Sequence, residues 1–195
     1  MFGYGYGYGL DPTVIIVIPA LLLSLWAQAS VKSTFSKYSQ IMAHGNVTAD
    51  SVARNLLSLY GMSGMPVNHV AGSLTDHYDP RNKTLNLSDD VYGSRSIASI
   101  GVAAHEAGHA IQHLEMYSPL ILRNSIVPAV NIATSASTPL FFLGLLMANS
   151  MLVTIGIMCF TAALVFHVVT LPVEINASSW ALKLLEQTGT LSQDE

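Results

Sequence analysis

Residues 124–173 read NSIVPAVNIATSASTPLFFLGLLMANSMLVTIGIMCFTAALVFHVVTLPV, a stretch without a single Asp, Glu, Lys or Arg. A helix that crosses a bilayer needs about 20 mostly apolar residues, so this stretch is long enough for two such helices. The polar pair Asn149-Ser150 stands near its middle. We therefore predict transmembrane helices at 126–148 and 151–172, joined by a tight turn. After Pro172 we predict a separate segment, 173–195, with Glu174 and a short amphipathic helix that ends at Gly189.

The composition agrees with a membrane protein. Of the 195 residues, 51% are hydrophobic and 10% are charged, whereas soluble domains carry about 25% charged residues. The net charge of −4 and the lack of a Lys/Arg cluster argue against a nucleic-acid partner. The single cysteine, Cys159, excludes a disulfide framework and a cysteine-based metal site. The chain is predicted to be an integral protein of the lipid bilayer.

A second uncharged run, residues 12–31, predicts a further transmembrane helix near the N-terminus. The helix is expected to continue past the membrane surface to about Ala43. The preceding tail, residues 1–11, alternates tyrosine and glycine, and its tyrosines suit the membrane interface. No Lys or Arg precedes the apolar run, which argues against a cleavable signal peptide.

The intervening segment, residues 32–123, has a different character and holds seven of the eight Lys and Arg residues. Its pattern predicts an amphipathic helix from Thr48 to Tyr60 and a longer helix from Ser94 or Ser96 to about Met116. Short strands are predicted at 67–71 and 84–87, flanking a turn at 79–82. The fold class is therefore mainly α: three transmembrane helices with a small juxtamembrane α+β region. The His-Glu-Ala-Gly-His sequence at 105–109, on the longer helix of this region, makes it zincin-like.

The motif His105-Glu106-Ala107-Gly108-His109 lies on the second of these predicted helices. Residues four apart lie one above the other, about 6 Å along the axis, so both imidazoles can converge on one tetrahedral zinc ion. Glu106 is offset by one residue and can face a water on that ion. It is the candidate catalytic base, which takes the proton of the water and delivers it to the leaving amine.

A zinc site of this kind needs a third protein ligand. Glu174 is favoured, because an unpaired carboxylate at the end of an uncharged helix would be costly, and two transmembrane helices return it to the side of His109. Glu115 competes less well as a ligand, because a site of that spacing needs a glycine that turns the chain, and Gln112 stands at that position. His113 competes less well, because the rise of the helix puts it too far from His105 for one zinc ion to reach both. Several loop aspartates also stay open as ligands: Asp76, Asp79, Asp89 and Asp90.

The sequence leaves open the roles of two more histidines and of one row of polar residues. His167 lies within the last predicted transmembrane helix, where a hydrogen bond to a polar neighbour explains it, although an intramembrane histidine also suggests function. His77 could support the substrate or the transition state. A polar stripe runs along the second predicted transmembrane helix: Asn131, Thr134, Ser135 and Thr138. Helix packing best explains this stripe, and a polar lining of a substrate groove is the alternative.

Beyond these single residues, the chain resembles the YugP-type membrane zinc metallopeptidases. The matching stretches occur in order along most of the chain: residues 32–38 (KSTFSKY), 74–80 (LTDHYDP), 96–112 (SIASIGVAAHEAGHAIQ) and 171–178 (LPVEINAS). The resemblance implies that His105 and His109 are zinc ligands, that Glu106 is the catalytic base, and that Glu174 is the third ligand, as in gluzincins. The chain departs from the family pattern at Asn176, where aspartate is frequent, and at Trp180, where arginine is frequent.

The favoured function is a membrane-embedded zinc endopeptidase that binds one zinc ion and cuts extended peptides or the ends of membrane proteins. The alternative is a zinc-binding but inactive membrane scaffold, in which a carboxylate at Glu106 has no chemical purpose. Basic residues gather in 32–123 and at Lys183, which predicts an outside N-terminus and a cytoplasmic zinc site. The sequence does not determine the oligomeric state, so a homo-oligomer and an accessory membrane partner both stay open.

Overall fold

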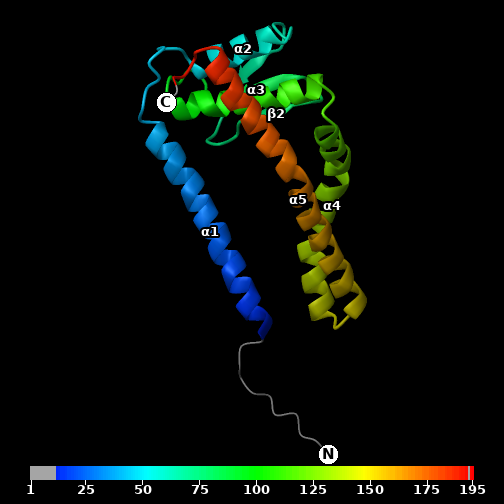
Figure 1. Ribbon diagram of the computed structural model, residues 1–195. Coiled ribbons are helices and arrows are strands. Elements are labelled where there is room, and N and C mark those ends of the chain that lie inside the picture. The colour runs from blue at the N-terminus through cyan, green and yellow to red at the C-terminus, as the bar shows by residue number, and fades with distance from the viewer. Residues whose placement is uncertain (1–11, 193) are drawn as a thin grey trace, which may run out of the picture. The chain divides into compact units, whose positions relative to one another are not determined.

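The computed structural model describes residues 12–192 and 194–195, and the chain separates into two units that meet between Ile41 and Met42 (Figure 1). The predicted Tyr/Gly-rich tail at 1–11 lies outside the described residues. The first unit holds one helix, α1 (Pro12–Tyr38). This helix ends before the predicted limit at Ala43, because Met42 forms an antiparallel bridge with Ser96 and the Ala43 amide donates to the carbonyl of Arg95.

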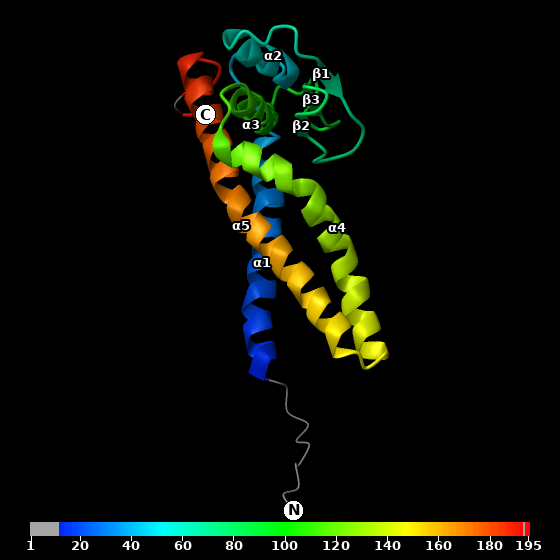
Figure 2. The ribbon, with the colours of Figure 1, turned by 90° about the vertical axis from the view of Figure 1, so that its right-hand side faces the viewer.

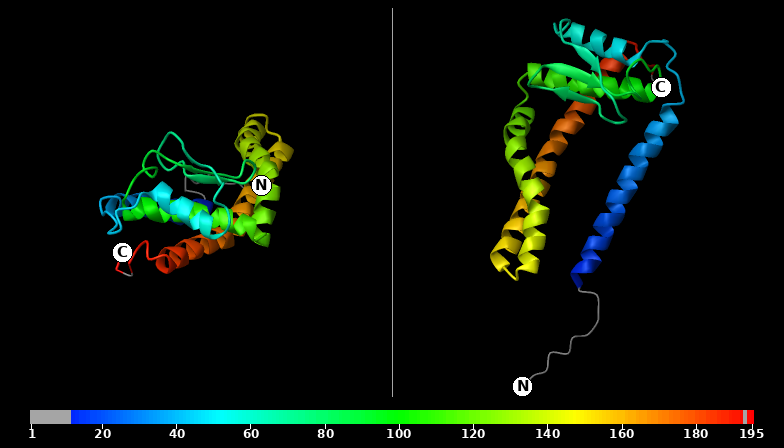
Figure 3. Two further views of the ribbon diagram at one scale, coloured as in Figure 1. Left: turned by 90° about the horizontal axis from the view of Figure 1, so that it is seen from above. Right: turned by 180° about the vertical axis from the view of Figure 1, so that it is seen from behind.

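The second unit combines a small α/β layer with a pair of long helices, which Figures 2 and 3 show from three further sides. Its elements, in chain order, are α2 (Ala49–Leu59), β1 (Val67–His69), β2 (His77–Asp79), β3 (Thr84–Leu87), α3 (Ile97–Leu114), α4 (Ser118–Leu146) and α5 (Ser150–Gln187). The core lies where α2 and α5 pack on α3 and where the sheet covers α3 from another side.

Helix α2 occupies the predicted place and buries its apolar face against α3. Val52, Leu56 and Leu57 are almost fully buried, whereas Leu59 remains exposed. The helix ends as predicted before Gly61, whose φ of +74° is a conformation that glycine adopts without steric cost.

The sheet has three strands in the order β1-β3-β2 and differs from the prediction. The predicted turn at 79–82 does not join β1 to β3; it joins β3 to an additional antiparallel strand, β2. Strand β1 pairs with the other edge of β3 in parallel, with Val67 opposite Leu85. The sequence pattern missed β2 because three mostly polar residues carry no alternation, and only pairing with β3 holds them extended.

Helices α4 and α5 form an antiparallel hairpin that turns at Asn149, as predicted. Asn149 caps α5, its side-chain oxygen accepting from the amides of Met151 and Leu152. The two helices approach closely at a glycine: a Cβ on Gly144 would lie 2.6 Å from the backbone nitrogen of Val153. Small residues at such crossings are typical of membrane helix pairs.

Two helices in the described part of the chain, α4 and α5, are long and apolar enough to cross a membrane. The transmembrane helix expected at 12–31 stays a prediction. Helix α5 is also longer than expected: it runs through Pro172 without a break to Gln187. The continuation has a tertiary cause, since Val173, Ala177 and Ala181 are buried where α5 packs on α3.

The crossing of α3 and α5 depends on Gly108. A Cβ atom at this position would lie 2.8 Å from the carbonyl oxygen of Ala177, which is too close for any real side chain. The glycine therefore lets the backbone of α5 lie directly on α3, beside His105 and His109.

We expect Gly108→Ala to lower the free energy of unfolding by about 1–3 kcal/mol, the usual cost of overpacking a well-packed contact. Gly101→Ala on the same helix is the matched control, because nothing lies within 4 Å of its Cβ position. Alanine is the better helix former by about 1 kcal/mol, so the control should be as stable as wild type or more so. Thermal unfolding of the detergent-solubilised proteins measures both, and equal destabilisation by the two variants would contradict the prediction.

Candidate functional site

Helix α3 presents the motif residues as the sequence predicted. It begins at Ile97, after Ser96, whose hydroxyl oxygen accepts a hydrogen bond from the amide of Ser99. His105 and His109 follow one another on one face of the helix, with ring centroids 4.7 Å apart. His109 is buried and His105 is half-buried, so the two rings are held in position by the packed helix rather than moving freely in solvent.

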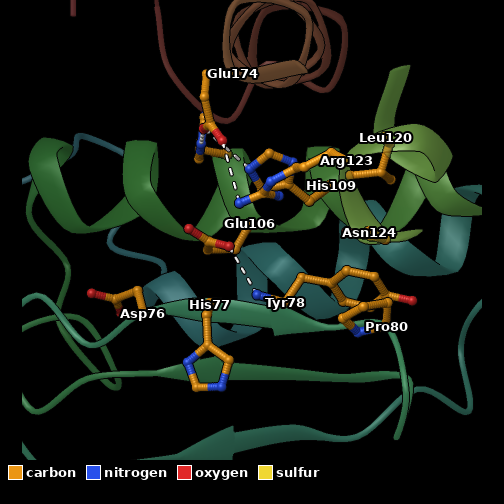
Figure 4. A pocket seen from close by; sticks show the side chains of 11 residues that line it. Asp76, His77, Tyr78, Pro80, Glu106, His109, Leu120, Arg123, Asn124 and Glu174 are labelled. Carbon is orange, nitrogen blue, oxygen red and sulfur yellow. Dashed lines mark hydrogen bonds and ion pairs between the residues drawn. The ribbon is translucent and has the colours of Figure 1, made fainter. Parts of the chain in front are cut away.

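Glu174 reaches the two histidines from α5 (Figure 4). Its Oε2 atom lies 3.2 Å from Nε2 of His105 and 3.4 Å from Nε2 of His109. Because α5 is continuous through Pro172, this carboxylate is fixed to the same rigid helix that packs on Gly108. The structure thus brings the two histidines and the favoured third residue together.

These three side chains have the chemistry of a metal site. One ligand atom from each of His105, His109 and Glu174 lies within 4.8 Å of the others, and in the described part of the chain they are the one such group of three. Two imidazole nitrogens and one carboxylate oxygen are a donor set that catalytic zinc sites use, with a fourth position left open. The residues therefore fit a zinc ion.

The second ring nitrogen of each histidine has its own partner. Nδ1 of His109 lies 3.0 Å from Oε1 of Gln112, and Nδ1 of His105 lies 3.2 Å from the hydroxyl of Ser178. When Nδ1 carries the proton and donates it to these oxygens, Nε2 keeps its lone pair and faces Glu174. Such partners orient the rings of metal-binding histidines.

Gln112 links α3 to α5 and was not recognised from the sequence. Its amide nitrogen donates to the carbonyl of Val173 at 2.9 Å and to Oδ1 of Asn176 at 2.8 Å. Gln112 thus stands between Asn176 and His109 and connects the two. The position of Gln112 three residues after His109, which places both on one side of the helix, is the sequence signal that could have indicated this role.

Glu106 points into the same space from the opposite side, as Figure 4 shows. Its Oε2 accepts a hydrogen bond of 3.0 Å from the backbone amide of Tyr78 on β2. Burial raises the pKa of the Glu106 carboxyl above its usual value, although His109, His105 and the Tyr78 amide oppose this effect. The strand that the sequence missed, β2, is thus what holds the candidate base in place.

A cavity of about 210 Å³ opens between these groups. Besides the motif residues and Glu174, its lining includes Tyr78, Arg123 and Asn124. One guanidinium nitrogen of Arg123, Nη2, lies 3.7 Å from Oε1 of Glu174. No spacing rule connects Arg123, fourteen residues after His109, with the motif, so sequence reasoning missed it.

The loop aspartates that stayed open as ligands stand apart from the group of three. Asp79 accepts from the amide of Arg81 within its turn, and Asp89 pairs with His69 at 2.6 Å. Asp90 accepts from the hydroxyl of Ser73. Asp76 lines the cavity, but both of its oxygens accept hydrogen bonds from Ser88.

The remaining candidates have other partners. His113 accepts from or donates to the hydroxyl of Tyr78 at 2.7 Å, and Glu115 forms the C-terminal cap of α3. His77 turns its ring away from Glu106 (Figure 4) and bonds to the carbonyl of Thr75 and the amide of Asn86. His167 is an exposed residue of α5 outside the group of three.

A family model described as "Putative neutral zinc metallopeptidase" matches residues 13–195. The chain belongs to this family. It is also 45% identical over 182 residues to the "Putative membrane protease YugP" of Bacillus subtilis (strain 168), a match that covers 93% of this chain and 81% of the relative. The expected resemblance is confirmed.

No solved structure gives a significant match to this member of the neutral zinc metallopeptidase family. The family description indicates zinc, in agreement with the group formed by His105, His109 and Glu174. The name of the relative and the two apolar helices α4 and α5 indicate association with a membrane.

Proposed function

We propose that the protein is a membrane-embedded zinc endopeptidase of the gluzincin type, with one zinc ion held by His105, His109 and Glu174. The observation that carries the proposal is the convergence of these side chains from two separate helices, with Glu174 Oε2 within 3.4 Å of both Nε2 atoms. An isolated HExxH pentapeptide would not produce such a convergence by chance. The membership of the family supports the same reading.

When bound, zinc supplies a Lewis acid and lowers the pKa of a water ligand to about 7. The Glu106 carboxylate, fixed by the Tyr78 amide, accepts the proton of the attacking water and passes it to the leaving amine. Gln112 and Ser178 keep the histidine rings oriented throughout. Arg123 lies beside the cavity, where its guanidinium can hold Glu174 in position.

The substrate class follows from where the cavity lies. Residues of the cavity belong to β2 and the turn beside it, to α3, to the first turns of α4, which begins the apolar hairpin, and to α5 through Glu174. A site at the start of such a hairpin suits peptides, or the extended ends of membrane proteins, at the surface of the lipid bilayer.

Replacing Glu174 should weaken zinc binding. We expect Glu174→Ala to lower the affinity by at least about tenfold, since loss of even a hydrogen-bond partner of a ligand costs 10–100-fold. Glu115→Ala is the control, because Glu115 is the C-cap residue of α3 through its backbone and does not line the cavity. Metal analysis of the purified proteins after dialysis against graded zinc measures both. Loss of zinc in Glu115→Ala, with none in Glu174→Ala, would show that the ligand has been misassigned.

Replacing Glu106 should separate chemistry from metal binding. We expect Glu106→Gln to keep its zinc while peptide hydrolysis falls by at least about 10²-fold, the low end for loss of general acid–base catalysis. Glu115→Gln serves as the matched control and should retain activity. A Glu106→Gln variant as active as wild type would contradict the role of Glu106. If wild type binds zinc and cleaves no peptide, the protein is the inactive scaffold instead.

We further propose three transmembrane helices, an outside N-terminus and a zinc site at the cytoplasmic face. Lys32, Lys37, Arg123 and Lys183 flank the ends of the proposed transmembrane segments on one side. The turn at Asn149-Ser150 carries no basic residue. Loops that stay in the cytoplasm are enriched in Lys and Arg, which favours this orientation.

Single cysteines introduced at Ser63 and Ser150, in a Cys159→Ser background, test the orientation. Both serines are exposed, so either would react with a thiol reagent on its own side of the membrane. With an impermeant reagent on intact cells, we expect labelling at Ser150→Cys and none at Ser63→Cys until the cells are opened. The reverse pattern would put the site outside the cell.

A further inference from the structure

A second cavity, of about 310 Å³, lies next to the catalytic cavity. Tyr78 lines both of them. The apolar part of the lining of the second cavity comes from the loop after α2 and from the end of α3. We call this part the methionine groove: Met62, Met65, Leu114 and Met116. None of these residues takes part in the proposed zinc chemistry.

The methionine groove leaves apolar side chains open to solvent. Leu114 is 50% exposed and Met116 is 66% exposed. Met116 also has a φ of +55°, a left-handed conformation that glycine adopts without strain and that methionine adopts at a cost. The chain thus holds a large flexible apolar side chain at a position where the backbone alone would favour glycine.

Tyr78 separates the two cavities and is held at both ends. Its backbone amide donates to Glu106 at 3.0 Å, and its hydroxyl lies 2.7 Å from Nδ1 of His113. The Tyr78 side chain is therefore held in place where the two cavities adjoin, between the candidate base and the methionine groove.

The distance between the sites can be expressed in peptide residues. Ala110, which lines the groove, lies four residues after Glu106 on α3, about 6 Å along the helix, and Leu114 lies about 12 Å away. An extended peptide advances about 3.3 Å per residue. A side chain that enters the groove therefore belongs to a residue two to four positions from the bond cleaved at Glu106.

We propose that the methionine groove binds a large apolar side chain of the peptide substrate, two to four residues from the scissile bond. The inference rests on the proposed peptidase function and adds its specificity. Because Tyr78 lines both cavities, a peptide held in the catalytic cavity lies beside the groove, which identifies the occupant as substrate. Methionine side chains adapt to differently shaped apolar groups, so Leu, Met and Phe should all fit. Lys83 in the same lining disfavours a basic side chain.

The test compares peptides that differ at one position. A peptide library cleaved by the purified, zinc-loaded full chain should show enrichment of Leu, Met or Phe two to four residues from the cut. For a matched pair with Leu or Ser at that position, we expect kcat/KM to differ by at least about tenfold in wild type. Met116→Lys should abolish most of this difference, and Met62→Lys is a second variant in case the first is misfolded.

Met42→Lys is the matched control, because Met42 is also 66% exposed and lies outside the groove. It should keep the full preference for Leu over Ser. A preference that survives in both groove variants, or a library without apolar enrichment at these positions, overturns the proposal.

A binding measurement separates this proposal from the proposed function. The Leu and Ser peptides are labelled with a fluorophore and titrated with the zinc-loaded Glu106→Gln variant. Tighter binding of the Leu peptide that Met116→Lys removes supports the groove, even if wild type cleaves nothing and the peptidase function fails. Equal binding of the two peptides overturns the groove, whatever the activity of wild type.

Discussion

The site depends on one close contact between two helix backbones, where Gly108 of α3 lies against Ala177 of α5. At this crossing no side chain separates the helices, so residues on α5 reach the motif histidines directly. Glu174 lies three residues before Ala177, about one turn away, and its carboxylate consequently meets both Nε2 atoms. The glycine of the motif is therefore as much a part of the geometry as the histidines.

Buried polar groups lock this crossing in place. Gln112 accepts from His109 and donates to Val173 and Asn176, so one side chain ties a candidate ligand to the neighbouring helix. Buried polar networks of this kind specify one arrangement, since any other leaves a group without a partner at a cost of about 1–3 kcal/mol. The Glu174 carboxylate is also a common partner, because Arg123, His105 and His109 all lie within 3.7 Å of its oxygens.

The continuity of α5 connects this chemistry to the membrane. One helix carries a long apolar segment and, past Pro172, the carboxylate and the alanines that pack on α3. A rigid connection of this kind fixes the distance between the site and the apolar hairpin. A broken helix at Pro172 would have left Glu174 on a movable segment, and its position relative to His105 and His109 would then depend on a flexible joint.

The sequence by itself determined the features that depend on local pattern. The uncharged run at 124–173 predicts the helical hairpin, the spacing of His105 and His109 predicts a shared face, and the Thr48–Tyr60 periodicity predicts α2, because helix geometry converts spacing into direction. Only the tertiary structure decided that β2 exists, that α5 continues through Pro172, and that Gln112, Tyr78 and Arg123 belong to the site. These features depend on contacts between residues far apart in the chain, which no local periodicity records.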